Sequence, residues 1–175
     1  MASQKLITAA GKALKDYMGV TKDESVLIIS DEDTRPIGIA LHEAGISIAN
    51  ESFYIEMKKR EVSGQEPPAV ISETMKNVDV VICATSKSLT HTDARRGATA
   101  KGVRVGTMPG ITTEILSRCF AADSNEIINL NNKLIALLKN ANEVKITTKK
   151  GTNATFKVKG RRVISSTGVL KNIGD

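Results

Sequence analysis

The chain has 175 residues, with 25 basic and 19 acidic side chains and a formal net charge of +6. This length suits one domain, or one domain with part of another. An apolar content of 41% is ordinary for a globular protein, and no apolar run approaches the roughly 20 residues that cross a bilayer. The charge is uneven, because residues 1–140 hold 17 basic and 17 acidic side chains while residues 141–175 hold 8 and 2.

Aromatic residues make up only 3% of the chain, and there is no tryptophan. This argues against a surface on which nucleic-acid bases stack, so a nucleic-acid partner is not expected. The basic tail could bind an anion, but on an alternating hairpin such residues are usually the solvated face. The first nineteen residues lack the continuous apolar stretch of a secretory signal. Cys83 and Cys119 each lie in an apolar-periodic segment, which predicts two buried thiols in a reducing cytoplasm. We therefore expect a cytoplasmic protein without membrane contact.

Strand and helix patterns alternate through the first part of the chain. Apolar residues at helical spacing predict a first helix over residues 4–18, which ends at Gly19. Short β-branched runs are typical of strands that are buried on both faces. The expected strands span 25–30, 52–57, 79–85 and 103–108, and the expected helices 37–44, 67–77, 90–101 and 112–120. The alternation predicts an α/β fold with an open, mainly parallel, Rossmann-like sheet and helices on both faces.

The pattern changes towards the C-terminus. Asp123 is expected to cap another helix, with Glu126 three residues later as in a capping box. The core face predicted for this helix consists of Ile127, Leu130, Leu134 and Leu137. Period-2 alternation then predicts an antiparallel β segment with one wet face. We expect an α/β domain over residues 1–142 and, over residues 143–175, the start of a truncated second domain that is too small to bury a core alone.

An acidic segment, DEDTRPIG, follows the first expected strand. It lacks the glycine turn of a dinucleotide site, and its carboxylates would repel a pyrophosphate. Asp31, Glu32 and Asp33 fit a solvated loop and a helix start, where the helix dipole favours acids. The alternative is that Asp31 and Thr34, at the carboxyl end of a strand, face a ligand.

The stretch TSKSLTHTDARRG, residues 85–97, begins where the third strand ends. Open α/β sheets bind ligands at this edge. Thr90 or Thr92 is expected to cap the next helix, which leaves His91 exposed at a helix start, where its neutral imidazole could hydrogen-bond a substrate. The alternative is a Ser/Thr-rich turn with an idle histidine, and a Ser–His–Asp triad within one turn is disfavoured. The substrate-facing candidates here are Ser86, Ser88, His91, Thr92 and Arg95.

The segment GTMPGIT, residues 106–112, follows the fourth strand at the same edge. It either forms a wall of the same crevice through Met108 and Gly110 or is an ordinary strand-to-helix turn. His42 and His91 are far apart in the sequence and belong to no metal-ligand motif. We therefore expect no metal site and assign no catalytic residue in this chain.

Four segments together resemble the N-terminal portion of the leucyl aminopeptidase (aminopeptidase T) family of metallopeptidases. They are SVLIISDEDT (25–34), SKSLTHTDAR (86–95), GVRVGTMPGIT (102–112) and TKKGTNATFKVKGR (148–161). The resemblance covers residues 5–170, and it extends to a related family, the iron-dependent dihydroxypyridine dioxygenases. Members are longer and carry their metal-ligating carboxylates and histidines in a C-terminal domain, so we expect those ligands to lie outside these 175 residues.

The resemblance implies the N-terminal domain of a metal-dependent, aminopeptidase-like hydrolase that is inactive alone. The alternatives are the corresponding domain of a ring-cleaving dioxygenase or a free-standing module that binds a small ligand. The full-length family implies Zn, Co or Fe, with no cofactor held by this chain. The expected partners are a C-terminal domain or second subunit in a homo-oligomer, and a peptide or small-molecule substrate, with the His91 loop as a wall of the cleft.

Overall fold

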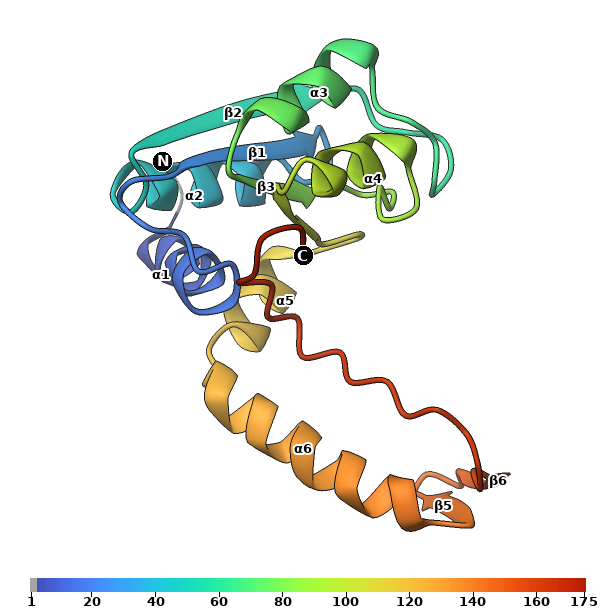
Figure 1. The fold of residues 1–175 in the computed structure, drawn as a ribbon. Helices are drawn as coiled ribbons and strands as arrows, with labels where there is room; N and C mark the ends of the chain where they lie inside the picture. The colour runs from blue at the N-terminus through green and yellow to red at the C-terminus, as the bar shows by residue number, and fades with distance from the viewer. Residues whose placement is uncertain (1–2) are drawn as a thin grey trace. The chain divides into compact units, whose positions relative to one another are not determined.

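The computed structural model describes residues 3–175, which form two compact units (Figure 1). Unit 1 comprises the chain up to Ala122 together with Gly168–Asp175, and unit 2 comprises Asp123–Thr167. The sequence instead placed a domain boundary at residues 142–143. The two units are compact parts of the structure and not necessarily domains that fold independently. The domain boundary at residues 142–143 therefore stays a prediction.

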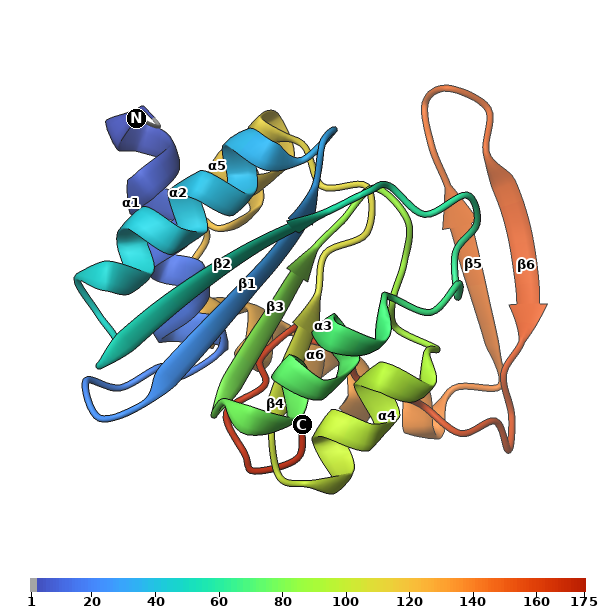
Figure 2. The same cartoon turned by 90° about the horizontal axis from the view of Figure 1, so that it is seen from above.

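A four-stranded parallel sheet forms the centre of unit 1, in the order β2-β1-β3-β4 (Figure 2). The two middle strands have neighbours on both sides, and the side chains of β3 are buried throughout. This explains the nearly continuous apolar runs in these segments. The strands are β1 (Ser25–Asp31), β2 (Glu51–Met57), β3 (Val80–Ala84) and β4 (Arg104–Thr107). The predicted mainly parallel α/β sheet is confirmed.

Helices cover both faces of this sheet, as the sequence predicted (Figure 2). Alternate side chains of β1 point to opposite faces: Ile28 packs into one core and Leu27 into the other. One face carries α1 (Gln4–Lys12), its π-helical continuation η1 (Ala13–Tyr17), α2 (Arg35–Ile46) and α5 (Thr113–Cys119). The other carries α3 (Ala69–Thr74), the 3₁₀ turn η2 (Met75–Asn77) and α4 (Asp93–Ala100).

Two glycines let α2 approach the sheet closely. A Cβ atom at Gly38 would lie 2.6 Å from the Tyr54 ring and 2.8 Å from Ser30. A Cβ atom at Gly45 would lie 2.5 Å from the hydroxyl of Ser52. Any larger residue at either position would push α2 away from β1 and β2.

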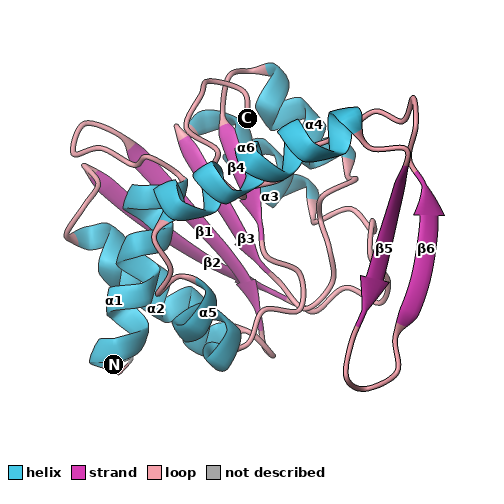
Figure 3. Cartoon of the chain, turned by 90° about the horizontal axis from the view of Figure 1, so that it is seen from below, coloured by secondary structure: helices cyan, strands magenta, loops and turns pink. Residues whose placement is uncertain are grey.

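Unit 2 consists of α6 (Ser124–Asn140) and an antiparallel hairpin of β5 (Glu143–Thr147) and β6 (Asn153–Lys157), which Figure 3 shows side by side. The predicted cap is confirmed, because the Asp123 carboxylate accepts from the backbone N–H groups of Asn125 and Glu126. The predicted core face of α6 is wrong. Leu130, Leu134 and Leu137 are 47–69% exposed, because periodicity marks an apolar face but does not supply the surface that covers it.

The two cysteines differ in burial. Cys83 on β3 is fully buried, whereas Cys119 is exposed, so the prediction of two buried thiols is wrong for Cys119. Cys119 is the last residue of α5, and Leu116 is the side chain of that helix that enters the core. Among the described residues, no helix combines the length and apolar character needed to span a membrane.

We predict that the two thiols react at very different rates. Burial raises the pKa of the Cys83 thiol to about 12, so almost none of it is thiolate at pH 8. Ellman's reagent should modify one thiol per native chain, and a second only after denaturation in guanidinium chloride. The variant Cys119→Ser should remove the fast reaction, and a fast reaction that persists in this variant would contradict the described burial.

An ion pair between Glu24 and Arg104 joins the segment before β1 to β4. The Arg104 guanidinium donates to both carboxylate oxygens at 2.8 and 2.9 Å, and its Nε donates to the Met18 carbonyl at 3.1 Å. The two side chains are 21% and 9% exposed, respectively, so the pair is largely desolvated. The hydrogen bond from Arg104 holds the pKa of the Glu24 carboxyl below its ordinary value.

Replacing Glu24 by Gln should lower the free energy of unfolding by roughly 3 kcal/mol, because Arg104 keeps its charge in a buried position. Folding lowers the pKa of the Glu24 carboxyl. The stability that the ionised carboxylate contributes is therefore fully present above the ordinary pKa of 4.5 and is lost as the pH falls through the lowered value. Urea unfolding should therefore separate wild type from Glu24→Gln at pH 7 and bring them together in acid. The matched control Glu114→Gln, which breaks a solvent-exposed pair with Arg118, should cost less than about 1 kcal/mol.

Candidate functional site

The carboxyl ends of the parallel strands lie along one edge of the sheet, and the connections that leave them meet there (Figure 2). Asp31, the last residue of β1, is fully buried at this edge. Its Oδ2 accepts from both the backbone N–H and the hydroxyl of Ser86, each at 2.7 Å. Its Oδ1 accepts from the N–H of Asp33 at 3.2 Å and lies 3.0 Å from the hydroxyl of Thr34.

Thr34 completes this network from the start of α2. Its hydroxyl lies 2.6 Å from the Ala84 carbonyl at the end of β3 and accepts from the Asp31 N–H at 3.1 Å. Asp31, Thr34 and Ser86 therefore bond to one another and join the ends of β1 and β3. The roles predicted for them towards a ligand remain predictions.

Three half-buried hydroxyl groups form a second network next to this one. The Ser88 hydroxyl donates to that of Thr90 at 2.9 Å, and Thr90 Oγ1 lies 2.8 Å from Thr107 Oγ1 at the end of β4. Each of these hydroxyls can both donate and accept a hydrogen bond. This cluster gives the edge an adaptable set of hydrogen-bonding groups.

His91 is exposed directly before α4, and Thr92 is the N-cap, since its hydroxyl accepts from the Arg95 N–H at 3.2 Å. Of the two caps that the sequence allowed, the structure uses Thr92. Within the described residues, the His91 imidazole hydrogen-bonds neither Ser86 nor Ser88, so these groups do not form a triad. Arg95, on the first turn of α4, is half-buried and forms no ion pair within the described part of the chain.

The connection between β2 and α3, residues 58–68, also reaches this edge. The Glu66 carboxylate accepts from the N–H groups of Asp93 and Ala94, at 2.5 and 3.1 Å, and so covers the amino end of α4. The Gly64 N–H donates to the Ser88 carbonyl at 2.8 Å. Lys59 bonds Glu32 through its backbone N–H and forms an ion pair with Asp33. Nothing near these residues in the sequence signals such long-range contacts.

The turn after β4 contributes Met108 and Gly110. The Met108 side chain packs partly against the core beneath the edge, and its N–H donates to the Cys83 carbonyl at 2.9 Å. Gly110 has a φ of +64°, which L side chains adopt only with strain, and its N–H donates to the Thr85 carbonyl at 2.9 Å. The turn is thus bonded to the end of β3, which places it at the edge predicted for a cleft wall.

Among residues 3–175, no three His, Cys, Asp or Glu side chains gather where they could hold a metal ion. His42 instead lies beside Ser52, with its Nδ1 3.0 Å from the hydroxyl, and stacks on Tyr54. The described residues therefore do not fit a zinc, cobalt or iron site by themselves.

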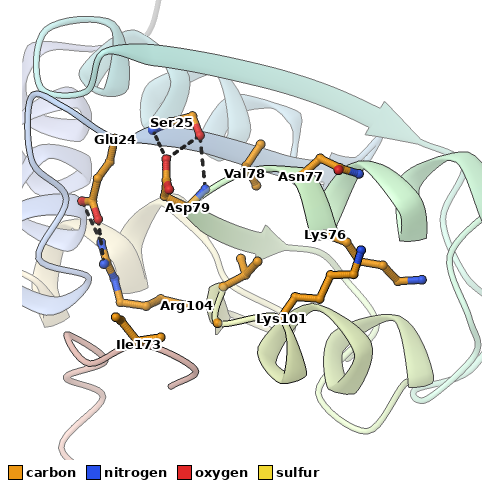
Figure 4. Close-up of a pocket in the computed structure, with 11 residues that line it drawn as sticks. Glu24, Ser25, Lys76, Asn77, Val78, Asp79, Lys101, Arg104 and Ile173 are labelled. Atoms are coloured by element: carbon orange, nitrogen blue, oxygen red, sulfur yellow. Dashed lines mark hydrogen bonds and ion pairs between the residues drawn. The ribbon is translucent and has the colours of Figure 1, made fainter.

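A pocket of about 470 Å³ lies at the opposite edge, near the amino ends of β1, β3 and β4 (Figure 4). The Glu24–Arg104 pair lines it, together with Asp79, whose Oδ2 accepts from the backbone N–H and the hydroxyl of Ser25, each at 2.7 Å. These charged groups satisfy one another. The bonds between these lining residues link the segments at the amino ends of the strands, and we place no ligand here.

The fold and this edge define an α/β protein whose parallel sheet gathers hydroxyl groups and a histidine at its carboxyl end. A family model described as 2,5-dihydroxypyridine 5,6-dioxygenase matches residues 5–175, so the chain belongs to that family. None of the curated proteins matches the sequence.

Solved structures share the fold. The chain is similar to the 2,5-dihydroxypyridine dioxygenase from Pseudomonas putida KT2440, with a TM-score of 0.68 and 15% identity over 97% of this chain and 51% of that one. It is also similar to wild-type AmpT, an aminopeptidase T, from Thermus thermophilus, with a TM-score of 0.50 and 12% identity over 86% of this chain and 58% of that one. The resemblance to both families is confirmed, and the chain spans about half the length of these relatives.

Asp31→Asn should be strongly destabilising, because an amide has one acceptor oxygen instead of two and turns its own N–H groups towards donors that Asp31 now accepts from. Leaving buried donors unpaired costs about 1–3 kcal/mol, so urea unfolding should show a loss near the upper end of this range. The matched control Asp33→Asn removes an exposed carboxylate from a surface ion pair and should cost less than about 1 kcal/mol. Equal losses for the two variants would contradict the structural role of Asp31.

Proposed function

We propose that this chain lines the substrate cleft of a ring-cleaving dioxygenase that acts on a small dihydroxylated pyridine. The observation that carries the proposal is the family model, which matches residues 5–175 under the name of that activity. The chain would form the N-terminal domain of the enzyme. Its carboxyl sheet edge would bind and orient the substrate.

The chemistry of the edge suits such a substrate. A dihydroxypyridine presents two hydroxyl groups and a ring nitrogen around a small apolar ring. The hydroxyls of Ser88, Thr90 and Thr107 can donate or accept, and the exposed His91 can do the same through either ring nitrogen. The partly buried Met108 offers a polarizable apolar contact for the ring. In this proposal the Asp31 network is the rigid support beneath these groups.

The side chains that hold the metal of such an enzyme would lie outside this chain. The described residues do not fit a metal site, so we propose that a C-terminal domain or a second subunit of a homo-oligomer supplies the ligands. The metal would provide the activation of oxygen when it is bound. This chain alone would bind substrate weakly and would not turn it over.

A metal-dependent aminopeptidase-like hydrolase is the second candidate. Its support is the likeness to AmpT at a TM-score of 0.50. In that case the same edge would face a peptide rather than an aromatic ring, with Zn or Co as the metal. The two candidates differ in the ligand that the edge prefers.

Titration of the whole chain, followed by two-dimensional NMR, should separate them. With 2,5-dihydroxypyridine, kept reduced under nitrogen, we expect shifts at residues 86–92 and 106–112. His91→Ala should weaken binding about fivefold to tenfold, the effect of losing one hydrogen bond. The control Lys101→Ala changes an exposed side chain at the opposite edge and should bind as wild type does.

Other outcomes decide against this proposal. Shifts at the same loops with leucinamide, but not with the pyridine, would favour the hydrolase. Shifts confined to residues 145–162 would indicate a general anion-binding tail and contradict both candidates.

A further inference from the structure

Unit 2 presents apolar side chains to solvent and buries none. Leu130, Leu134 and Leu137 recur at i, i+4 and i+7, so they form one stripe along α6. Among residues 123–167, Ser124 is the buried side chain, and no apolar residue is buried. A stripe of exposed leucines on a helix is characteristic of a surface that another molecule covers.

The hairpin adds a second exposed apolar face. The strand register pairs Val144 with Phe156 and Ile146 with Ala154, and side chains opposite each other lie on the same face of a sheet. Ile146 and Phe156 are 48% and 51% exposed. An isolated two-stranded hairpin is marginally stable in water, and a packed apolar face is what stabilises one.

Unit 2 also carries the whole net charge of the protein. It contains nine basic and three acidic side chains, whereas unit 1 contains sixteen of each. Six ion pairs lie within the part of unit 1 that the structure describes. None of the nine basic side chains in residues 123–167 forms an ion pair within the described chain. They are Lys133, Lys139, Lys145, Lys149, Lys150, Lys157, Lys159, Arg161 and Arg162.

We propose that the leucine stripe of α6 and the apolar face of the hairpin dock a protein partner with an apolar contact surface bordered by carboxylates. Such a partner would cover the leucines and Phe156, and its carboxylates would pair with the unpaired basic side chains. The proposal depends on unit 2 alone and not on the substrate of the sheet edge.

Other occupants suit the surface less well. Two copies of unit 2 would each carry a net charge of +6, and the repulsion between them opposes association. Nucleic acid would neutralise the charge but leave the leucines uncovered. Helices that lie on lipid surfaces carry many lysines or arginines on the polar face, whereas α6 has five asparagines and two lysines.

Two synthetic helical peptides of about 18 residues test the proposal. Both carry leucines at i, i+3 and i+4, and the other positions are Glu in one (the Glu peptide) and Lys in the other (the Lys peptide). Fluorescence anisotropy with the full chain should give micromolar binding of the Glu peptide and at least about tenfold weaker binding of the Lys peptide, with affinity falling as salt rises. Leu134→Gln and Lys149→Glu/Lys150→Glu should each weaken binding of the Glu peptide several-fold.

The control Val70→Gln exchanges an apolar side chain of unit 1 that is more exposed than Leu134, and it should leave binding unchanged. Circular dichroism should show that all variants keep their fold. Polyglutamate without leucine that binds as tightly as the Glu peptide would overturn the proposal, because charge alone would then suffice. If the chain sediments as a dimer and Leu134→Gln makes it a monomer, the occupant is a second copy and the proposal is overturned. Flotation with phosphatidylglycerol vesicles that is lost in Leu134→Gln would overturn it in favour of a lipid surface.

Discussion

Unit 1 depends on the need to cover both faces of a parallel sheet. β1 and β3 lie in the middle, so their alternate side chains supply two separate cores, and helices must cover each one. Parallel strands can be joined only by connections that return along the sheet. All the strands therefore end at the same edge, and the residues that follow them in the sequence meet there in space.

A buried carboxylate at that edge imposes the next constraint. Asp31 keeps its place away from water because the N–H of Asp33 and the N–H and hydroxyl of Ser86 satisfy its oxygens. These bonds join β1, the start of α2 and the segment after β3 into one rigid support. The groups that remain free to meet a ligand, His91 above all, lie around this support. Rigid positioning of a few exposed polar groups is what a binding site requires.

Unit 2 follows a different balance of forces. Its local hydrogen bonds are satisfied, from the Asp123 cap to the register of β5 and β6. Its apolar side chains, in contrast, remain exposed, and its basic side chains are unpaired. The described residues of unit 1 bury two apolar cores and form six ion pairs, whereas those of unit 2 bury no apolar side chain and their basic side chains form no ion pair. The family model matches residues of both units.

The sequence by itself determined the order of helices and strands, the cap at Asp123, the limitation of the α4 cap to Thr90 or Thr92, and the edge where polar residues gather. These features depend on periodicity and on hydrogen bonds between neighbours, which are written within a few residues. Only the tertiary structure decided that Asp31 bonds Ser86, 55 residues away, that Glu66 covers the start of α4, and that Cys119 and Leu134 stay exposed. Burial and long-range bonding depend on which surfaces the topology brings together, and no local pattern records that.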